Sequence, residues 1–157
     1  MAQGLRMRVL LIVCWLTLLT GSARAGCLIL CGDSGVEPGV AAQMLADELQ
    51  APLPPSVTVE AMWEGGFQDQ FIQVRLSATE AGTAALLAQM GLDMSALKQV
   101  SADSLGPPHD DGWGPQTEIV LLGGEGTLGH FAFTQVAISP FPGTLDQTTI
   151  YIFAFET

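Results

Sequence analysis

Residues 108–114 bring together side chains that commonly bind ligands. His109, Asp110 and Asp111 stand side by side, and Trp113 follows between two glycines. An imidazole and two carboxylates offer nitrogen and oxygen ligands, and an acidic surface would suit a hard cation such as calcium. The spacing of a calcium-binding loop is absent, zinc needs more ligands, and Asp and Gly also serve ordinary turns. We therefore take these four residues as binding candidates, the first three also as metal candidates, and expect no cofactor.

The tryptophans beside glycines allow two interpretations. Trp113 follows Gly112, and Trp63 stands just before Gly65-Gly66. An indole on a loop can stack on a sugar or anchor a partner protein. Tryptophans are usually largely buried, so the interpretation we favour is that each ring folds back over the edge of a small core.

A third candidate is a serine near the start of the mature chain. An apolar run leads into Gly-Asp-Ser ending at Ser34, which resembles the first block of the SGNH or GDSL hydrolases. The resemblance implies Ser34 as the acyl-transfer nucleophile and Gly32 near the oxyanion hole, and such a serine needs a base. That family uses Asp-x-x-His, a spacing that neither His109 nor His130 has, and an asparagine, which this chain lacks. The alternative is that Asp33 or Ser34 caps the first helix.

The glycines of residues 124–129 match the letters of a dinucleotide-binding fingerprint, Gly-x-Gly-x-x-Gly. That fingerprint works only when its last glycine opens a helix whose N-terminus faces the pyrophosphate. Residues 130–136 instead alternate with the period of a strand. We predict a turn between two strands.

The mature chain has an even pair of cysteines, Cys27 and Cys31. In an oxidising compartment we expect them to form a disulfide across a small ring. Ala25-Gly26-Cys27 also ends like a lipoprotein acceptor site, although Arg24 replaces the expected apolar residue, so lipidation of Cys27 is the alternative.

The first 25 residues have the layout of a secretory signal peptide. Two arginines precede an apolar run that is too short to span a bilayer, and Ala23-Arg24-Ala25 forms a small-x-small cleavage site. We predict a signal peptide over 1–25 and one exported domain over 26–157, in the periplasm or outside the cell, or at the outer membrane if lipidated. The domain keeps two basic residues against sixteen acidic ones, a net charge of −14, which disfavours nucleic-acid binding and electrostatic membrane docking.

Hydrophobic periodicity predicts an α+β domain around a central strand and helix. The fold is a mostly antiparallel sheet of about five strands with two main helices packed on one face. Residues 70–77 alternate as a strand, Ser77 or Thr79 caps the following helix, and Gly91 ends it. The other expected strands are 57–63, 118–122, 130–138 and 148–155, the other expected helices are 38–50 and the shorter 94–100, and 101–117 is a long loop.

Two stretches, VRLSATEAGTAALLAQMGL and TTIYIFAFE, resemble small exported bacterial proteins and lipoproteins that have no assigned activity. The resemblance covers about residues 56–157 and implies no catalytic residue. We expect a non-enzymatic exported domain that contacts a protein, glycan or cation through the 101–117 loop. The alternative is a small serine hydrolase that uses Ser34.

Overall fold

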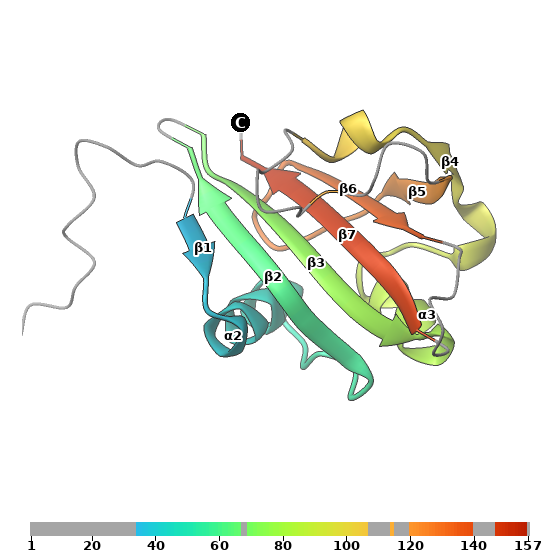
Figure 1. The fold of residues 1–157 in the computed structure, drawn as a ribbon, viewed down its shortest axis with the longest axis horizontal. Coiled ribbons are helices and arrows are strands. Elements are labelled where there is room, and N and C mark those ends of the chain that lie inside the picture. The colour runs from blue at the N-terminus through green and yellow to red at the C-terminus, as the bar shows by residue number, and fades with distance from the viewer. Residues whose placement is uncertain (1–33, 67–68, 107–113, 115–119, 140–146, 157) are drawn as a thin grey trace, which may run out of the picture. The chain divides into compact units, whose positions relative to one another are not determined.

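The computed structural model describes residues 34–66, 69–106, 114, 120–139 and 147–156. These residues form seven strands, two α-helices and two short 3-10 helices, as drawn in Figure 1. In chain order they are β1 (Ser34–Val36), α2 (Pro38–Leu49), β2 (Val57–Gly65), β3 (Phe71–Thr79), α3 (Glu80–Gln89), η1 (Met94–Ala96), β4 (Lys98–Val100), η2 (Ala102–Leu105), β5 (Leu121–Glu125), β6 (Phe133–Ile138) and β7 (Gln147–Phe155).

All seven strands belong to one antiparallel sheet in the order β1-β2-β3-β7-β6-β5-β4. The chain builds one edge first, crosses through α3 to the opposite edge at β4, and returns strand by strand to the centre. The two long strands β3 and β7 meet there in nine register pairs, from Phe71 opposite Phe155 to Thr79 opposite Gln147. The last strand therefore closes the sheet beside the strand that the sequence marks as central.

The first helix begins and ends where its local chemistry directs. Glu37 is the N-cap, because its side chain accepts hydrogen bonds from the backbone N–H groups of Gly39 and Val40, and Pro38 supplies the fixed φ that suits a first turn. Ala41 and Leu45, four residues apart, are fully buried. Gln50 adopts a left-handed conformation, φ 52°, which ends the helix.

The second helix follows the central strand without a linker, as the sequence predicts. Thr79 Oγ1 accepts from the N–H of Gly82 at the N-terminus, and Gly91 takes φ +74° just after the C-terminus, a conformation that costs glycine little. Leu86, Leu87 and Met90 are fully buried, whereas Ala84 is exposed.

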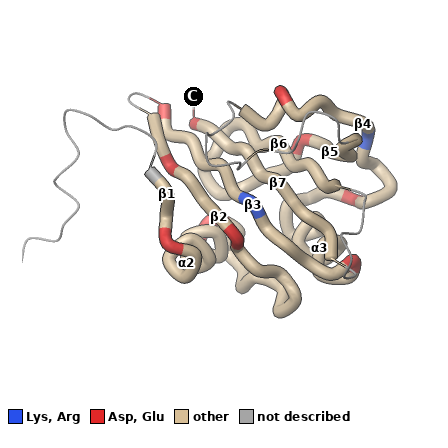
Figure 2. The backbone as a smooth tube through the Cα atoms, in the orientation of Figure 1, with Lys and Arg blue, Asp and Glu red and all other residues tan. Residues whose placement is uncertain are grey.

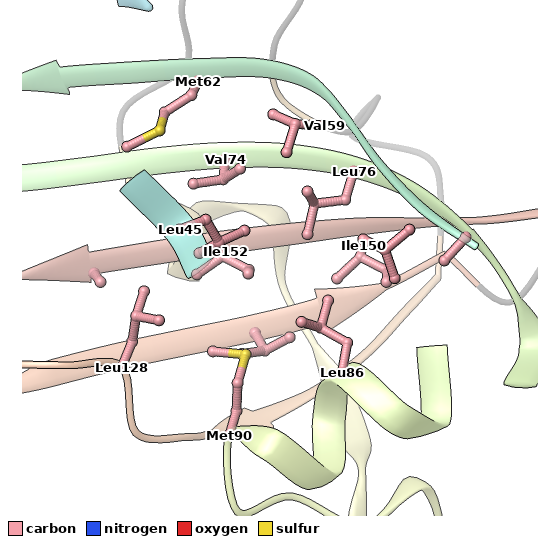
Figure 3. Close-up of a cluster of buried hydrophobic side chains, with 14 of the residues drawn as sticks. Leu45, Val59, Met62, Val74, Leu76, Leu86, Met90, Leu128, Ile150 and Ile152 are labelled. Carbon is pink, nitrogen blue, oxygen red and sulfur yellow. The ribbon is translucent and has the colours of Figure 1, made fainter. Parts of the chain in front are cut away.

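Both helices pack on the same face of the sheet, which we call the helix face. The main core lies between them and the strands (Figure 3). Leu45 comes from α2, Leu86 comes from α3, and Met90 is the C-cap of α3. Ile150 and Ile152 come from the central strand β7. Strand residues on the helix face alternate with residues on the opposite face, which we call the far face.

The α+β class is confirmed, but the expected count of about five strands is wrong. Among the described residues the sheet has seven strands, because β1 and β4 add a three-residue strand at each edge. Residues 94–100 are likewise not one helix. Asp93 caps a single 3-10 turn through the N–H of Ser95, and the chain then turns into β4. Three residues are too few to display a period, so neither edge strand has a sequence signature.

The remaining differences concern segment ends and surface residues. Ser34 lies in β1, not at the helix cap. Val40 on α2 is apolar yet 54% exposed. The strand expected at 118–122 runs from Leu121 to Glu125, and residues 118–119 lie outside the described residues. The expected loop 101–117 begins with η2, whose Leu105 is fully buried.

Candidate functional site

The far face carries four phenylalanines from three adjacent strands. Phe71 on β3 lies opposite Phe155 on β7, which in turn lies opposite Phe133 on β6. Phe153, two residues earlier on β7, points to the same face. Phe71, Phe133, Phe153 and Phe155 are all half-buried, and we call them the phenylalanine cluster.

The four rings contact one another in tilted and edge-on arrangements. Phe153 is central, with ring centroids 6.3 Å from Phe71, 6.5 Å from Phe133 and 5.8 Å from Phe155. Phe133 and Phe155 are closest, at 5.1 Å. Such pairs contribute about 0.5–1.5 kcal/mol each beyond simple burial. The rings therefore hold one another in place while part of each remains accessible.

Two buried glutamines flank Phe153 and have their amides engaged. Gln73 and Gln135 lie opposite Phe153 on its two neighbouring strands. Gln73 Nε2 donates to the carbonyl of Leu105 at 3.1 Å, and Gln135 Nε2 donates to the carbonyl of Gly124 at 3.2 Å. The amide groups beside Phe153 thus stabilise the fold through hydrogen bonds to backbone carbonyls.

The chain reaches this face through η2 and Gly106. Leu105 packs with Leu121, Ala137 and Tyr151 in a second apolar cluster on the far face. Gly106 follows with φ +87°, and a Cβ there would lie only 2.7 Å from Gln73 Nε2 and 2.8 Å from a ring carbon of Phe153. Only glycine fits this position comfortably. The predicted ligand-binding stretch therefore starts beside the phenylalanine cluster.

An ion pair occupies the middle of the far face. Arg75 Nε lies 3.1 Å from Glu60 Oε2, with side chains 29% and 38% exposed. Tyr151 lies directly opposite Arg75 in the register of β3 and β7. Burial raises the pKa of the Tyr151 phenol, the positive charge of Arg75 partly offsets this rise, and Glu60 adds to it.

His130 joins two acidic residues from different elements. Its Nδ1 lies 3.0 Å from Glu48 Oε2 near the end of α2, and its Nε2 lies 2.6 Å from Glu156 Oε1 just after β7. The imidazole also stacks on Phe131 with a centroid distance of 4.5 Å. Because both ring nitrogens contact carboxylates, this residue ties the end of the last strand to the first helix.

The candidate residues named from the sequence fall in different parts of the chain. His109, Asp110, Asp111 and Trp113, and both Cys27 and Cys31, lie outside the described residues. Trp63 is half-buried and packs against the second apolar cluster, as expected for a ring that covers the core. In the described ranges, no group of three His, Cys, Asp or Glu side chains is arranged to hold a metal ion.

Ser34 and His130 approach different ends of the first helix. Ser34 is exposed, pairs with Glu64 at the edge of the sheet, and precedes the N-terminus of α2. His130 contacts Glu48 near the C-terminus of that helix, which spans 12 residues, or about 18 Å at 1.5 Å per residue. The two side chains are not arranged as a nucleophile and its base.

The Gly-x-Gly-x-x-Gly stretch forms the turn between strands that its flanking periodicity predicts. Gly124 and Glu125 end β5, and Gly129 takes φ +51° before β6. No helix follows it to receive a pyrophosphate.

Sequence reasoning missed the phenylalanine cluster, although a signal was present. Phe153 and Phe155 sit at alternate positions within one predicted strand, and Phe133 lies in another. In each strand the intervening residues are also apolar or buried, so both faces of the strand look like a core face. When helices cover only one face of a sheet, apolar residues on the other face indicate a candidate interaction surface.

No α-helix in the described part of the chain is long and apolar enough to cross a membrane. No family model, curated protein or solved structure matches the sequence or the fold, so the assignment of function rests on the molecule's own residues.

Proposed function

We propose that this protein is a non-enzymatic exported binding domain that holds a polypeptide partner on its phenylalanine cluster. One observation carries the proposal. Four half-buried phenylalanines from β3, β6 and β7 meet on the sheet face that neither helix covers. Aromatic rings that are rigid, clustered and partly accessible are typical anchors of protein interfaces.

The chemistry of the surroundings supports a polypeptide over a glycan. A glycan site needs polar groups that can bond to hydroxyls, but the amides beside Phe153 are buried and already donate to backbone carbonyls. A net charge of −14 in the predicted mature chain disfavours nucleic acid and anionic lipid. A polypeptide can place one or two apolar side chains on the rings and needs no polar group from beneath them.

The serine hydrolase alternative gains no support among the described residues. Both ring nitrogens of His130 contact carboxylates, and Ser34 lies at the sheet edge. No observation favours it over binding.

Site-specific photo-crosslinking in cells that naturally produce the protein tests the proposal. A photoreactive phenylalanine analogue replaces Phe71, Phe133 or Phe155 in separate variants, and Val40, which is 54% exposed on α2, serves as the matched control. We expect the same partner polypeptide to be captured from all three cluster positions and not from Val40. If folded variants at all three positions capture nothing beyond the Val40 control, the proposal is wrong.

A further inference from the structure

We propose that the polypeptide partner is a basic, apolar segment whose lysines or arginines face the carboxylates around the phenylalanine cluster. This inference rests on the proposed function and specifies its partner. It is carried by the charges that surround the rings.

The cluster has the width of a short segment. Phe133, Phe155 and Phe71 lie on three adjacent strands, so the row spans two strand spacings, or about 10 Å. Phe153 broadens the row along β7. A surface of this width accommodates one or two side chains of a partner, and the rest of the partner must contact the rim.

The rim is acidic. Glu125 ends β5 and lies opposite Gln135 on β6, which in turn lies opposite Phe153 on β7. On the other side, Asp69 stands two residues before Phe71. Both carboxylates are exposed, and within the described ranges neither of them forms an ion pair.

Few cations are present to neutralise this rim. Among the described residues, Arg75 on β3 and Lys98 on β4 are the only arginine and lysine, and Figure 2 shows them in blue among red acidic positions. Arg75 is engaged with Glu60 in the middle of the sheet. Lys98 lies on the edge strand β4, opposite Gly123, and forms no ion pair among the described residues. The field around the rings is therefore negative, and it attracts a basic partner and repels an acidic one.

The same charges argue against a second copy of this chain as the occupant. Two copies facing each other would bring Asp69 and Glu125 of each toward the same carboxylates of the other. Each copy also carries a predicted mature charge of −14. Like charges brought together at an interface oppose association, so self-association is the disfavoured outcome.

Binding of defined peptides to the purified mature protein tests the inference. The probe is a seven-residue peptide of alternating lysine and leucine. The matched peptides replace its lysines by glutamate, its lysines by serine, or its leucines by serine. We expect the lysine–leucine peptide to bind at least about tenfold more tightly than each of the others, and its affinity to fall as salt rises.

Protein variants separate specific docking from general attraction. We expect Phe133→Ser and Phe155→Ser each to weaken binding of the lysine–leucine peptide by about tenfold, and Glu125→Gln to weaken it several-fold. Val40→Ser and Asp47→Asn, on α2, are the controls and should leave the affinity unchanged. Circular dichroism confirms that each variant is folded.

Two results would contradict the inference in distinguishable ways. If the glutamate–leucine or serine–leucine peptide binds as tightly and still depends on Phe133 and Phe155, the binding face stands and the basic partner is wrong. If the lysine–leucine peptide binds equally well to folded Phe133→Ser and Phe155→Ser proteins, its attraction is nonspecific. The inference then fails, and photo-crosslinking from the cluster decides the proposed function separately.

Discussion

Arg75 on β3 lies directly opposite Tyr151 on β7, in the middle of the sheet and on the face away from both helices. The buried phenol and the guanidinium affect each other because they share this face, and Glu60 completes the set through its ion pair with Arg75.

Tyr151 should ionise at a pH above the ordinary value for tyrosine, about 10. Burial, the main cause, disfavours the phenolate and raises the pKa of Tyr151. The contribution of the neutral phenol to the stability of the folded state is therefore complete below about pH 10 and is lost as pH rises through the folded-state pKa. Tyr151 is the only tyrosine in the chain, so the change in near-ultraviolet absorbance on phenol ionisation reports this residue alone. We expect the titration to move down to about 10 in denaturant.

The neighbours of Tyr151 should move that titration in opposite directions. Arg75→Met should raise the pKa of Tyr151 further, because a favourable positive charge is lost, and Glu60→Gln should lower it. Lys98→Met removes a positive charge from the edge strand β4 and is the control. Equal shifts for Arg75→Met and Lys98→Met would show that the local contact has no special effect.

Gly106→Ala should destabilise the fold by about 1–3 kcal/mol. The backbone there has φ +87°, and the new Cβ would press on Gln73 and Phe153. Gly114→Ala is the matched control, since a Cβ at Gly114 meets nothing within 4 Å. Urea unfolding of both variants measures the difference. Equal free energies of unfolding would mean that Gly106 is not constrained as described.

Thr134→Val should leave stability unchanged or raise it by up to about 1 kcal/mol. The Thr134 hydroxyl is buried and has no hydrogen-bond partner among the described residues, so valine removes an unsatisfied group at nearly constant volume. The equally buried Thr83 donates to the carbonyl of Thr79 at 3.0 Å. Thr83→Val should therefore cost about 0.5–1.5 kcal/mol of stability. In thermal unfolding, the Tm of Thr83→Val should fall below that of wild type, whereas the Tm of Thr134→Val should be unchanged or higher.

His130 and Glu156 should show a small coupling energy in a double-mutant cycle. Their contact is partly exposed, with His130 52% and Glu156 35% accessible, and such pairs contribute about 0.2–1 kcal/mol. The cycle uses His130→Ala and Glu156→Gln, followed by urea unfolding. A parallel cycle of His130→Ala with Asp47→Asn, whose carboxylate contacts Gln43, should give no coupling. Coupling in the second cycle and not in the first would contradict the bridge.

The long elements were predictable because their signals are local. The strand Phe71–Thr79 and the helix α3 that follows it are both indicated by nearby residues. Thr79 caps this helix and Gly91 ends it, all within about twenty positions of the strand. The turn at residues 124–129 was also predictable, since the period of the following residues excludes a helix. Alternation and capping depend on backbone geometry that neighbouring residues impose directly.

The edge strands and the phenylalanine cluster were not predictable in the same way. β1 and β4 exist because longer strands present unpaired backbone groups to them. The cluster forms because β7, the last strand, inserts between β3 and β6 and places Phe155 between Phe71 and Phe133. Strand order is set by how the whole set of apolar faces can be buried together, and no single segment encodes it.

The sequence by itself determined the α+β class, the approximate positions of the long helices and strands, and a strongly acidic charge. Only the tertiary structure decided which side chains share a surface, because residues 71, 133, 153 and 155 become neighbours through register alone. The physical reason is the difference in range: periodicity and capping act over a few residues, whereas strand pairing joins segments more than sixty residues apart.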